Sequence, residues 1–505
     1  MTPRPVGQRT GRDGFPQLLH AEWTKFRTVQ SWVTGMAVTA LLVVLVALLA
    51  GFSSDQKGAQ PVPVGPGGEP VTDSYFFVHQ PLAGDGSVTV SVSALESSIP
   101  KGPGDLRRGT VPWAKAGLVI KESTRQGSPY AAMMATGSHG VRMQDGYVND
   151  TAGLPGPVSA ESPRWLRLDR SGDTITGYAS TDGTKWTKVS TAQVSGLRST
   201  VQVGLFVASP PAVEGRGTVG SVSTAVFGDL RFQGGWSGGE LTGEQLGAGS
   251  PTFAGYPDNG SGSFTRSGDQ FTVTGAGDIA PAVRDTLPTG GTLRDILTGT
   301  FPALIAVIVV GALFITTEYR SNMIHVTLAA SPRRSRILVA KAIVLGAVTF
   351  VAGLVGAVLA VPLGERLAKG NGVYIFPVTS STELRVALGT AALLATASIL
   401  ALCVGTIFRH SSGAVTTVIV AIVLPYILTA IPFMPASAAN WLARVTPAAA
   451  FAVQQTLVPY EQVASHYTPY NGYYPLAPWV GFAVLACYAV ASLIVAAVLL
   501  DRRDA

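Results

Sequence analysis

The chain contains 505 residues, of which 47% are hydrophobic and only 13% are charged, against about 25% charged residues in an ordinary globular protein. So few charges exclude both a wholly soluble enzyme and a disordered chain, which would need high charge and few apolar residues. The net charge of +6 first suggests a nucleic-acid partner, but residues 53–299 hold 19 basic and 22 acidic residues, and the remainder holds 17 and 8. The excess positive charge therefore lies in the apolar part of the chain, which is typical of a membrane protein and argues against nucleic-acid binding.

The first predicted element is an amphipathic helix within the N-terminal segment 1–31. One helical face of residues 15–30 carries Leu19, Trp23 and Phe26, and the basic residues Lys25 and Arg27 lie elsewhere. Such a helix suits the surface of a membrane, which makes lipid an expected partner.

The first membrane span is predicted at residues 32–52, where no charged residue occurs between Arg27 and Asp55. A cleaved signal peptide has a shorter apolar region and a small-x-small cleavage site, which does not follow this segment. We therefore expect an uncleaved anchor.

Residues 53–297 are predicted to form an all-β domain inserted between the first and second spans. Short runs of alternating polar and apolar residues, such as 87–95 and 201–209, are separated by Gly, Asp and Ser turns. This pattern is typical of an antiparallel β-sandwich. Residues 182–185 (DGTK) are predicted to form the turn of a hairpin.

Five further apolar segments complete a set of six α-helical membrane spans, since about 20 residues cross a bilayer. They are residues 298–317, 338–363, 386–408, 413–434 and 478–500. With a cytoplasmic N-terminus, 13 basic residues lie in the cytoplasmic segments and 4 lie in the short outer loops. This bias predicts a plasma-membrane protein with both termini inside and residues 53–297 outside. We expect no acidic or basic residues within the spans, which argues against an ion path.

The sequence predicts no catalytic residues, no cofactor and no metal site. It contains no P-loop motif, no G-x-S-x-G motif and no pair of His at i and i+4. The two cysteines, Cys403 and Cys487, fall in predicted spans, where small buried thiols are expected. We therefore expect this chain not to be an enzyme.

The most informative cytoplasmic segment is the loop 318–337 between the second and third spans. It carries charges where the second span ends, then a short apolar face, then arginines. These residues are Glu318 and Arg320, then Met323, Ile324, Thr327 and Leu328, then Arg333, Arg334 and Arg336. A short helix of this kind suits docking to a soluble partner, and the arginines would meet acidic side chains or anionic lipid. An ordinary positive-inside loop would explain the arginines, but not Glu318 or the apolar positions.

This loop reads T-E-Y-R-x-x-M-I-x-x-T-L-x-x-x-P-x-R and resembles the cytoplasmic loop of type 2 ABC exporter permeases. Residues 21–32 (AEWTKFRTVQSW) are similar to the N-terminal elbow helix of that family. The resemblance covers residues 15–52 and 298–503, and six spans with both termini inside fit it. The large insert departs from the compact members of the family, which have a short loop there.

The resemblance implies a separate ATP-binding subunit that hydrolyses ATP and a second permease that is identical or similar to this chain. The implied ATPase-docking residues of the coupling loop are Glu318, Tyr319, Arg320, Met323, Ile324, Thr327, Leu328, Pro332, Arg333 and Arg334. The implied elbow-helix residues are Glu22, Trp23, Lys25, Phe26 and Arg27. ATP binding would favour one of two states of the paired six-span bundles and open a central path between them.

Three stretches of the insert, residues 73–86, 113–123 and 165–187, resemble the concanavalin-like (laminin-G-like) sandwich. Residues 261–281 are similar to a strand pair that precedes the first of these stretches in that family. We therefore expect a permuted strand order, which would bring both ends of the domain to one face.

Members of that sandwich family often bind glycans, and the candidate glycan contacts here are Trp113, Trp165 and Trp186. The same aromatic residues could instead fill the core between the two sheets. The leading hypothesis is a permease subunit that exports an amphipathic or hydrophobic substrate. The alternative is a multi-span surface receptor or glycan-binding protein that uses the lectin-like domain, although one span would suffice to anchor it.

Overall fold

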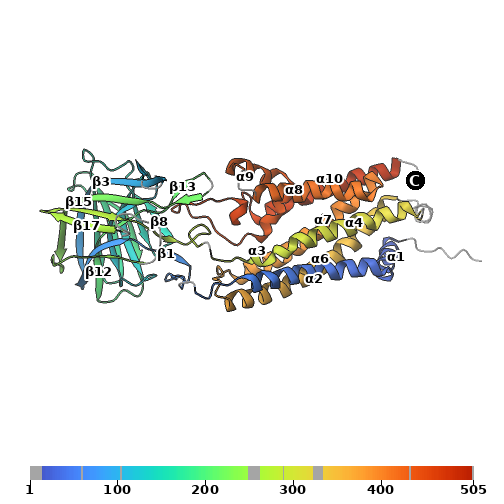
Figure 1. Cartoon of the computed structure of the whole chain (residues 1–505), viewed down its shortest axis with the longest axis horizontal. Helices are drawn as coiled ribbons and strands as arrows, with labels where there is room; N and C mark the ends of the chain where they lie inside the picture. Colours follow the sequence, from blue (N-terminus) through green and yellow to red (C-terminus); the bar gives the residue numbers. More distant parts are fainter. Residues whose placement is uncertain are drawn as a thin grey trace, which may run out of the picture. The chain divides into compact units, whose positions relative to one another are not determined.

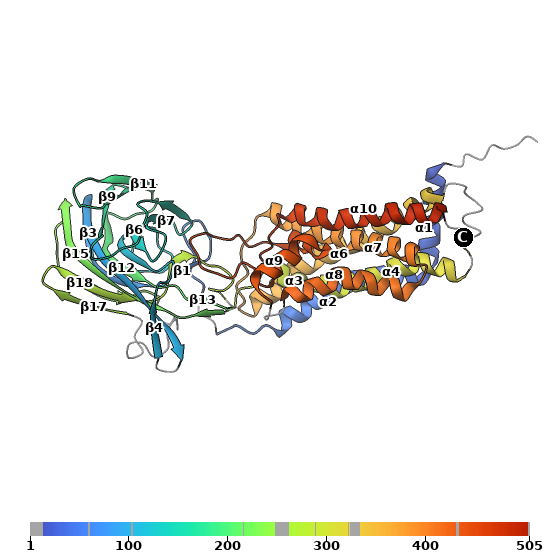
Figure 2. The ribbon, with the colours of Figure 1, turned by 90° about the horizontal axis from the view of Figure 1, so that it is seen from above.

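The computed structural model describes residues 14–58, 61–102, 105–215, 217–247, 262–287, 289–321, 323, 334–430 and 434–502. The chain forms two compact units. The helical unit consists of Met1–Ala59, Thr289–Leu457 and Tyr467–Ala505, and the β unit consists of Gln60–Pro288 and Val458–His466. Figure 1 and Figure 2 show the helices of the first unit and the strands of the second.

The described residues contain six helices that are long and apolar enough to cross a membrane, so the predicted six-helix architecture with an inserted β domain is confirmed. The six are α2 (Gln30–Ser53), α4 (Thr300–Arg320) with the short α3 (Leu293–Ile296) and η1 (Leu297–Gly299) before it, α6 (Arg334–Gly370), α7 (Ser380–Phe408), α8 (Ser411–Ala430) and α10 (Pro478–Arg502). The other helical elements among the described residues are α1 (Phe15–Thr28), α9 (Ala436–Val445), η2 (Pro447–Gln454) and η3 (Pro469–Asn471).

Helix α6 is longer than its predicted apolar segment, 338–363, because polar turns continue the helix at both ends. It has 37 residues and is therefore about 56 Å long at 1.5 Å per residue. The hydrocarbon core of a bilayer is only about 30 Å thick. The ends of α6 therefore extend beyond the hydrocarbon core. Glu365 and Lys369, near its C-terminal end, form an i,i+4 ion pair at 2.7 Å.

Small residues let the span helices approach one another closely. A Cβ atom on Gly311 of α4 would lie 2.4 Å from the backbone oxygen of Ser398 in α7, and one on Gly481 of α10 would lie 2.3 Å from the backbone oxygen of Ala449 in η2. Since lipid tails are as apolar as leucine, such close packing, rather than water exclusion, holds membrane helices together. Buried Leu304, Ile308 and Leu394 belong to the core that results.

The β unit is an antiparallel sandwich of two large sheets, as the alternating runs predict. The eight-stranded sheet has the order β11 (Thr187–Gln193), β10 (Thr174–Ser180), β9 (Arg164–Ser171), β3 (Gly86–Gly102), β15 (Val222–Gly234), β18 (Gln270–Gly275) and β17 (Gly262–Ser267), with β4 (Asp105–Gly109) also paired to β3. The seven-stranded sheet has the order β16 (Thr242–Gln245), β2 (Phe76–Ala83), β12 (Thr200–Ala208), β5 (Lys115–Lys121), β6 (Tyr130–Thr136), β7 (Val141–Asp145) and β8 (Asn149–Ala152). Two short pairs join β1 (Val71–Asp73) to β19 (Ile279–Pro281) and β13 (Ala212–Glu214) to β14 (Gly217–Val219).

The central strands β5 and β6 of the seven-stranded sheet are buried on both faces. Alternate residues of β5, such as Leu118 and Ile120, belong to one core, which also contains Leu166 and Leu168 of the facing sheet. The intervening Val119 belongs to a second core on the other face. Every residue of β5 is therefore buried, and Tyr75, Phe77, Tyr130, Tyr147 and Phe206 fill the second core.

The two ends of the β unit are joined, because β1 and β19 pair with Val71 opposite Pro281. The prediction that both ends reach one face of the domain is confirmed. Two buried ion pairs fasten these ends to β5: Lys121 Nζ lies 2.7 Å from Asp73 Oδ2, and Lys115 Nζ lies 2.5 Å from Asp278 Oδ1. Both lysines are fully buried.

The predicted hairpin turn at residues 182–185 is confirmed between β10 and β11. Asp182 Oδ1 accepts hydrogen bonds of 2.8 Å from the backbone N–H groups of Thr184 and Lys185. These donors stabilise the ionised carboxylate and lower the pKa of Asp182. Gly183 has a φ of +70°, which glycine adopts without strain.

Candidate functional site

Four charged side chains meet where α1, the end of α4 and the beginning of α6 pack together. We call Glu22, Lys25, Glu318 and Lys341 the charge cluster. Lys341 Nζ donates to Glu22 Oε2 at 2.7 Å and to Glu318 Oε1 at 2.6 Å. Lys25 Nζ donates to Glu22 Oε1 at 3.0 Å and to Glu318 Oε1 at 3.4 Å. Two acids and two lysines therefore form one closed network across three helices.

Aromatic packing positions the charge cluster. Glu22 and Phe26 lie one turn apart on α1, and both are buried. The rings of Phe26 and Trp32 meet Phe314 of α4 edge to face, with centroids 5.8 and 5.7 Å apart. Lys341 Nζ lies 4.9 Å from the centre of the Phe314 ring, within range of a cation–π interaction. Phe314 therefore contacts α1 through Phe26 and the beginning of α2 through Trp32, and it covers the lysine.

Burial makes this network sensitive to the loss of any one charge. Lys341 is 0% exposed, Glu22 is 2% exposed and Glu318 is 8% exposed. Burial alone would lower the pKa of Lys25, but the nearby Glu22 and Glu318 carboxylates outweigh it and raise that pKa. Lys25 therefore remains protonated at neutral pH and balances the second acid. Removing one partner from a buried ion pair leaves an uncompensated charge, which costs far more than an exposed pair contributes.

The expectation that the spans contain no acidic or basic residue is wrong at Lys341. This residue lies within the predicted third span, where its charge is compatible with the apolar surroundings because two carboxylates accept hydrogen bonds from its ammonium group. The count of basic residues in the sequence places it among the 13 cytoplasmic cations.

The structure describes five of the ten predicted docking residues of the coupling loop. Glu318 is buried in the charge cluster, whereas Arg320 is exposed and Met323 is 52% exposed. Tyr319 lies under the Arg409 guanidinium, 5.3 Å from ring to charge. Arg334 donates to the backbone oxygen of Leu500 at 3.1 Å. The other five predicted residues, Ile324, Thr327, Leu328, Pro332 and Arg333, lie outside the described residues.

The predicted elbow helix is present as α1, but its buried face differs from the apolar face expected from the sequence. Glu22 and Phe26 are buried, whereas Trp23 is 44% exposed and Arg27 is exposed. Lys25 of α1 and Lys341 of α6 make burial of Glu22 favourable. The contact with Lys341 comes from another helix, so the helical pattern of α1 cannot show it.

A second site lies at the opposite end of α4. A cavity of about 200 Å³ is lined by Arg294, Asp295, Leu297, Thr298, Thr300, Phe301, Tyr426, Phe451, Gln454 and Tyr470. Arg294 donates to the backbone oxygen of Tyr470 at 3.1 Å and to the Tyr426 hydroxyl at 3.2 Å. The cavity thus combines aromatic walls with one guanidinium and one carboxylate, that of Asp295. Sequence reasoning missed it, although an arginine and an aspartate, Arg294 and Asp295, precede the apolar span directly.

The three candidate glycan contacts do not lie in one environment. Trp113 is only 5% exposed, and its ring stacks on His139 with centroids 3.9 Å apart. Trp165 and Trp186 are half-buried. Trp165 lies on the outer side of β9, since its neighbours Arg164 and Leu166 are buried, and its indole packs on Gly183. Of these three tryptophans, only Trp165 and Trp186 therefore have part of the ring accessible to a ligand.

Within the part of the chain that the structure describes, no group of three or more His, Cys, Asp or Glu side chains is placed to hold a metal ion. The buried thiol of Cys403 and the exposed thiol of Cys487 are not joined in a disulfide.

Residues 122–505 match the protein family described as ABC-2 family transporter protein, which covers more than half of the chain. This chain belongs to the ABC-2 transporter family. The match includes α4, α6, α7, α8 and α10 together with most of the β strands. The ABC-2 chain is therefore a membrane component of an ABC-type transporter. No curated protein sequence matches it.

The ABC-2 chain also shows distant similarity to solved structures. Scytalido-glutamic peptidase with a transition-state-analog inhibitor is 11% identical, with a TM-score of 0.27 over 40% of this chain and 98% of the peptidase. A second structure of that peptidase with a peptide-based analog has the same identity and coverage and a TM-score of 0.23. A functionally unknown protein from Saccharomyces cerevisiae is 14% identical, with a TM-score of 0.17 over 31% of this chain and 72% of its own. Sequence identities and TM-scores this low support no inference about the activity of the ABC-2 chain.

Proposed function

We propose that this ABC-2 chain is the permease subunit of an ATP-driven exporter and that a separate ATP-binding subunit powers it. The charge cluster is the observation that carries the proposal. It ties α1 to the ends of α4 and α6 that the charge bias assigns to the cytoplasm. An ATPase that moves α1 or the coupling loop would therefore move two spans with it, because a buried ionic network does not stretch continuously.

The proposed cargo is amphipathic or hydrophobic, and the working unit pairs two copies of this chain or this chain with a similar permease. Four of the residues lining the cavity beside Arg294 carry aromatic rings, namely Phe301, Tyr426, Phe451 and Tyr470. Aromatic walls suit apolar groups, and the guanidinium suits a polar or anionic head. We place both termini in the cytoplasm of a plasma-membrane protein, with the β unit outside.

Docking of the ATPase is expected to depend on Arg320, which is exposed and lies beside the buried Glu318. Changing Arg320→Ala should weaken co-purification with the cognate ATP-binding subunit by roughly tenfold, the loss expected for one charge-assisted contact. The stability of the chain should change by less than about 0.5 kcal/mol, as for other surface substitutions.

Arg444→Ala is the matched control, because Arg444 is also an exposed arginine but lies on α9. It should leave co-purification unchanged. If the Arg320→Ala and Glu318→Gln variants associate with the ATPase and transport as well as the wild type does, the coupling loop is not part of the docking surface.

The alternative function, a surface glycan-binding protein, is favoured by one observation on the β unit. Half-buried Trp165 lies beside Arg167 and Tyr178 on the outer face of the eight-stranded sheet, and the Arg167 guanidinium covers the Tyr178 ring at 5.6 Å. The part of the Trp165 indole that remains accessible is a suitable platform for a sugar ring.

If glycan binding is the function, a glycan array probed with the full-length chain should show Trp165-dependent binding. Trp165→Ala should abolish that signal with little loss of stability. Trp113→Ala should instead destabilise the chain by about 3–5 kcal/mol, because Trp113 is a buried ring. An array with no signal from the wild-type chain would contradict this alternative and leave the permease proposal intact.

A further inference from the structure

Arg294, which lines the cavity of about 200 Å³ at the beginning of α4, is a cation held by neutral groups. It belongs to a stretch, Leu293–Arg320, that is apolar enough to cross a membrane. Its hydrogen-bond acceptors are the backbone oxygen of Tyr470 and the Tyr426 hydroxyl, and it forms no ion pair with a described carboxylate. A charge in or beside a membrane span is costly and is normally paired, so this guanidinium calls for an anion.

The guanidinium is held in place and can still donate. Its carbon lies 6.0 Å from the centre of the Tyr426 ring and 5.6 Å from that of Tyr474, within range of cation–π interactions. It has more N–H donors than its two acceptors use. Arg294 is half-buried, and its Nε has no partner but is not one of the buried unpaired polar atoms of the described residues, so Nε is accessible.

Asp295, the one acid among the described residues that line this cavity, is engaged elsewhere. Its Oδ2 accepts hydrogen bonds from the backbone N–H of Thr292 at 2.9 Å and from the Thr292 hydroxyl at 3.0 Å. These contacts form the capping box at the beginning of α3. The Asp295 carboxylate therefore stabilises the chain locally and leaves Arg294 without an ion-pair partner.

Aromatic rings continue from the guanidinium along the wall of the cavity. The centre of the Tyr426 ring lies 4.2 Å from that of Phe451 and 5.6 Å from that of Phe301. A ligand whose charged group contacts Arg294 therefore places its neighbouring carbons against these rings. The cavity is smaller than the pockets of roughly 300–1,000 Å³ that enclose whole drug-sized ligands, so it suits a head group and the first part of an apolar chain.

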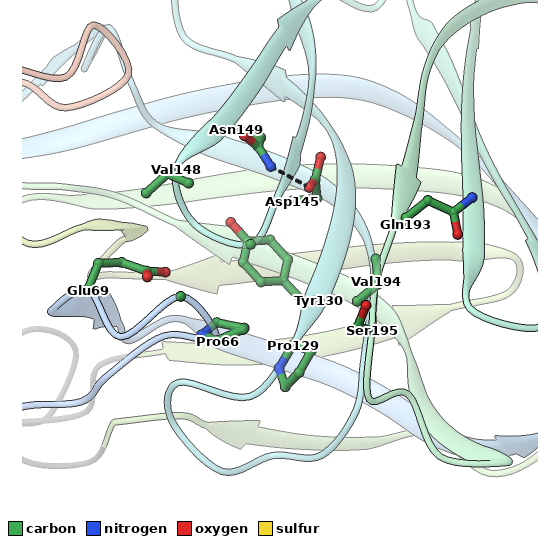
Figure 3. Close-up of a pocket in the computed structure, with 12 residues that line it drawn as sticks. Pro66, Glu69, Pro129, Tyr130, Asp145, Val148, Asn149, Gln193, Val194 and Ser195 are labelled. Carbon is green, nitrogen blue, oxygen red and sulfur yellow. Dashed lines mark hydrogen bonds between the residues drawn. The ribbon is translucent and has the colours of Figure 1, made fainter.

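The larger cavity of the β unit, with a volume of about 300 Å³, has the opposite character. Figure 3 shows Tyr130, Glu69 and Asp145 among the residues that line it. The described lining includes two carboxylates and no Lys, Arg or His. Because like charges repel, an anion is disfavoured there. Of these two cavities, the one beside Arg294 is therefore suited to an anionic ligand.

We propose that the cavity beside Arg294 binds an amphiphile with an anionic head, either a carboxylate or a phosphate monoester, and that the exported cargo is therefore acidic. The head accepts hydrogen bonds from the Arg294 guanidinium, and the first carbons of the chain contact Tyr426, Phe301 and Phe451. The role of this ligand as cargo rests on the proposed export function, whereas its binding can be measured without transport.

The test measures equilibrium binding of radiolabelled probes to the full-length chain in phosphatidylcholine nanodiscs, with empty nanodiscs as the blank for partitioning into lipid. Dodecanoate and dodecyl phosphate are the anionic probes, and dodecanol and dodecylammonium are their neutral and cationic matches. We expect saturable binding of at least one anionic probe and at least tenfold weaker binding of both matches. The tighter anion assigns the head group. Acetate or inorganic phosphate that binds as tightly as the amphiphiles would overturn the proposal, because the site would then take a free anion.

Variants locate the site. Arg294→Gln should weaken binding of the anionic probe by roughly tenfold or more, since it removes one charge-assisted contact. Arg294→Lys keeps the charge and should bind more tightly than Arg294→Gln. Arg366→Gln is the matched control, because Arg366 is an exposed arginine of α6 outside the lining, and it should bind like the wild type. Equal binding of dodecanol and dodecanoate, no saturable binding of either anion, or wild-type affinity in Arg294→Gln would overturn the proposal.

Transport separates this proposal from the export function on which its cargo role rests. ATP-dependent movement of dodecylammonium, without binding or movement of either anion, would overturn the acidic cargo and leave the exporter intact. Arg294-dependent binding of dodecanoate, without ATP-dependent movement of any amphiphile, would support the binding site and contradict the exporter.

Discussion

Replacing Lys341 with methionine is expected to lower the free energy of unfolding by about 3–5 kcal/mol, because it leaves buried acids without their shared partner. Lys341 is fully buried and donates to both Glu22 and Glu318. The remaining Lys25 contacts both acids at longer distances, 3.0 and 3.4 Å, and so compensates only in part. Thermal unfolding of the detergent-purified chain measures the loss.

The same change should loosen α1 specifically, which distinguishes a joint between helices from a general stabilising contact. Hydrogen exchange of the α1 amides, residues 15–28, should increase in the Lys341→Met variant, while exchange in α10 stays unchanged. Lys369→Met is the matched control on the same helix, because Lys369 forms an exposed pair with Glu365. That control should cost less than about 0.5 kcal/mol. Equal, small effects of both substitutions would contradict the charge cluster.

A charge-balanced double variant separates electrostatics from packing. Lys341→Met combined with Glu318→Gln removes one cation and one anion, so it should be more stable than Lys341→Met alone. The non-additivity of the two single changes measures their coupling, which is expected to be about 1–3 kcal/mol for residues in one buried network. Additive effects would mean that the two side chains do not interact.

Replacing Lys121 with methionine should have a comparable effect on the β unit. Its Nζ is fully buried and donates to Asp73 Oδ2 at 2.7 Å and to Tyr147 Oη at 3.0 Å. Without it, the ionised Asp73 stays buried with donors from Tyr147 and Gly127 at 2.7 and 2.8 Å. We expect a loss of about 3–5 kcal/mol, and faster hydrogen exchange in β1 and β19, which join the two ends of the unit.

Lys188→Met is the control for this prediction, because Lys188 is an exposed residue of β11. It should change stability by less than about 0.5 kcal/mol. Tyr147→Phe removes one donor to Asp73 and should cost roughly 1.5–3 kcal/mol, as for a hydrogen bond to a charged group. Wild-type exchange of β1 and β19 in the Lys121 variant would show that this ion pair does not fasten the ends of the domain.

The architecture could be predicted because membrane spans and sandwich strands have local signatures. Long apolar runs reveal helices α2, α4, α6, α7, α8 and α10, and alternation between glycine-rich turns reveals the strands. The turn at Asp182-Gly183 could be predicted for the same reason, since its chemistry lies within four residues.

The sites could not be predicted with equal success because they depend on long-range contacts. Glu22 lies 319 residues before Lys341 and Glu318 lies 23 residues before it, on three different helices, so no local pattern links them. Lys341 in isolation resembles any positive-inside lysine. Similarly, Trp113 resembles an exposed platform in the sequence, but His139 covers its ring, and nothing near Tyr130 in the sequence indicates that Glu69 lines the same cavity.

The central claim, that a separate ATPase drives this permease through the charge cluster, is tested most directly by reconstitution. The chain and its cognate ATP-binding subunit are placed in proteoliposomes, and ATP-dependent movement of a fluorescent amphiphile is measured. We expect movement only with both subunits and ATP, and its loss in Lys341→Met liposomes that still bind the ATPase. Movement that is independent of the ATPase, or unchanged in the Lys341 variant, would contradict the claim.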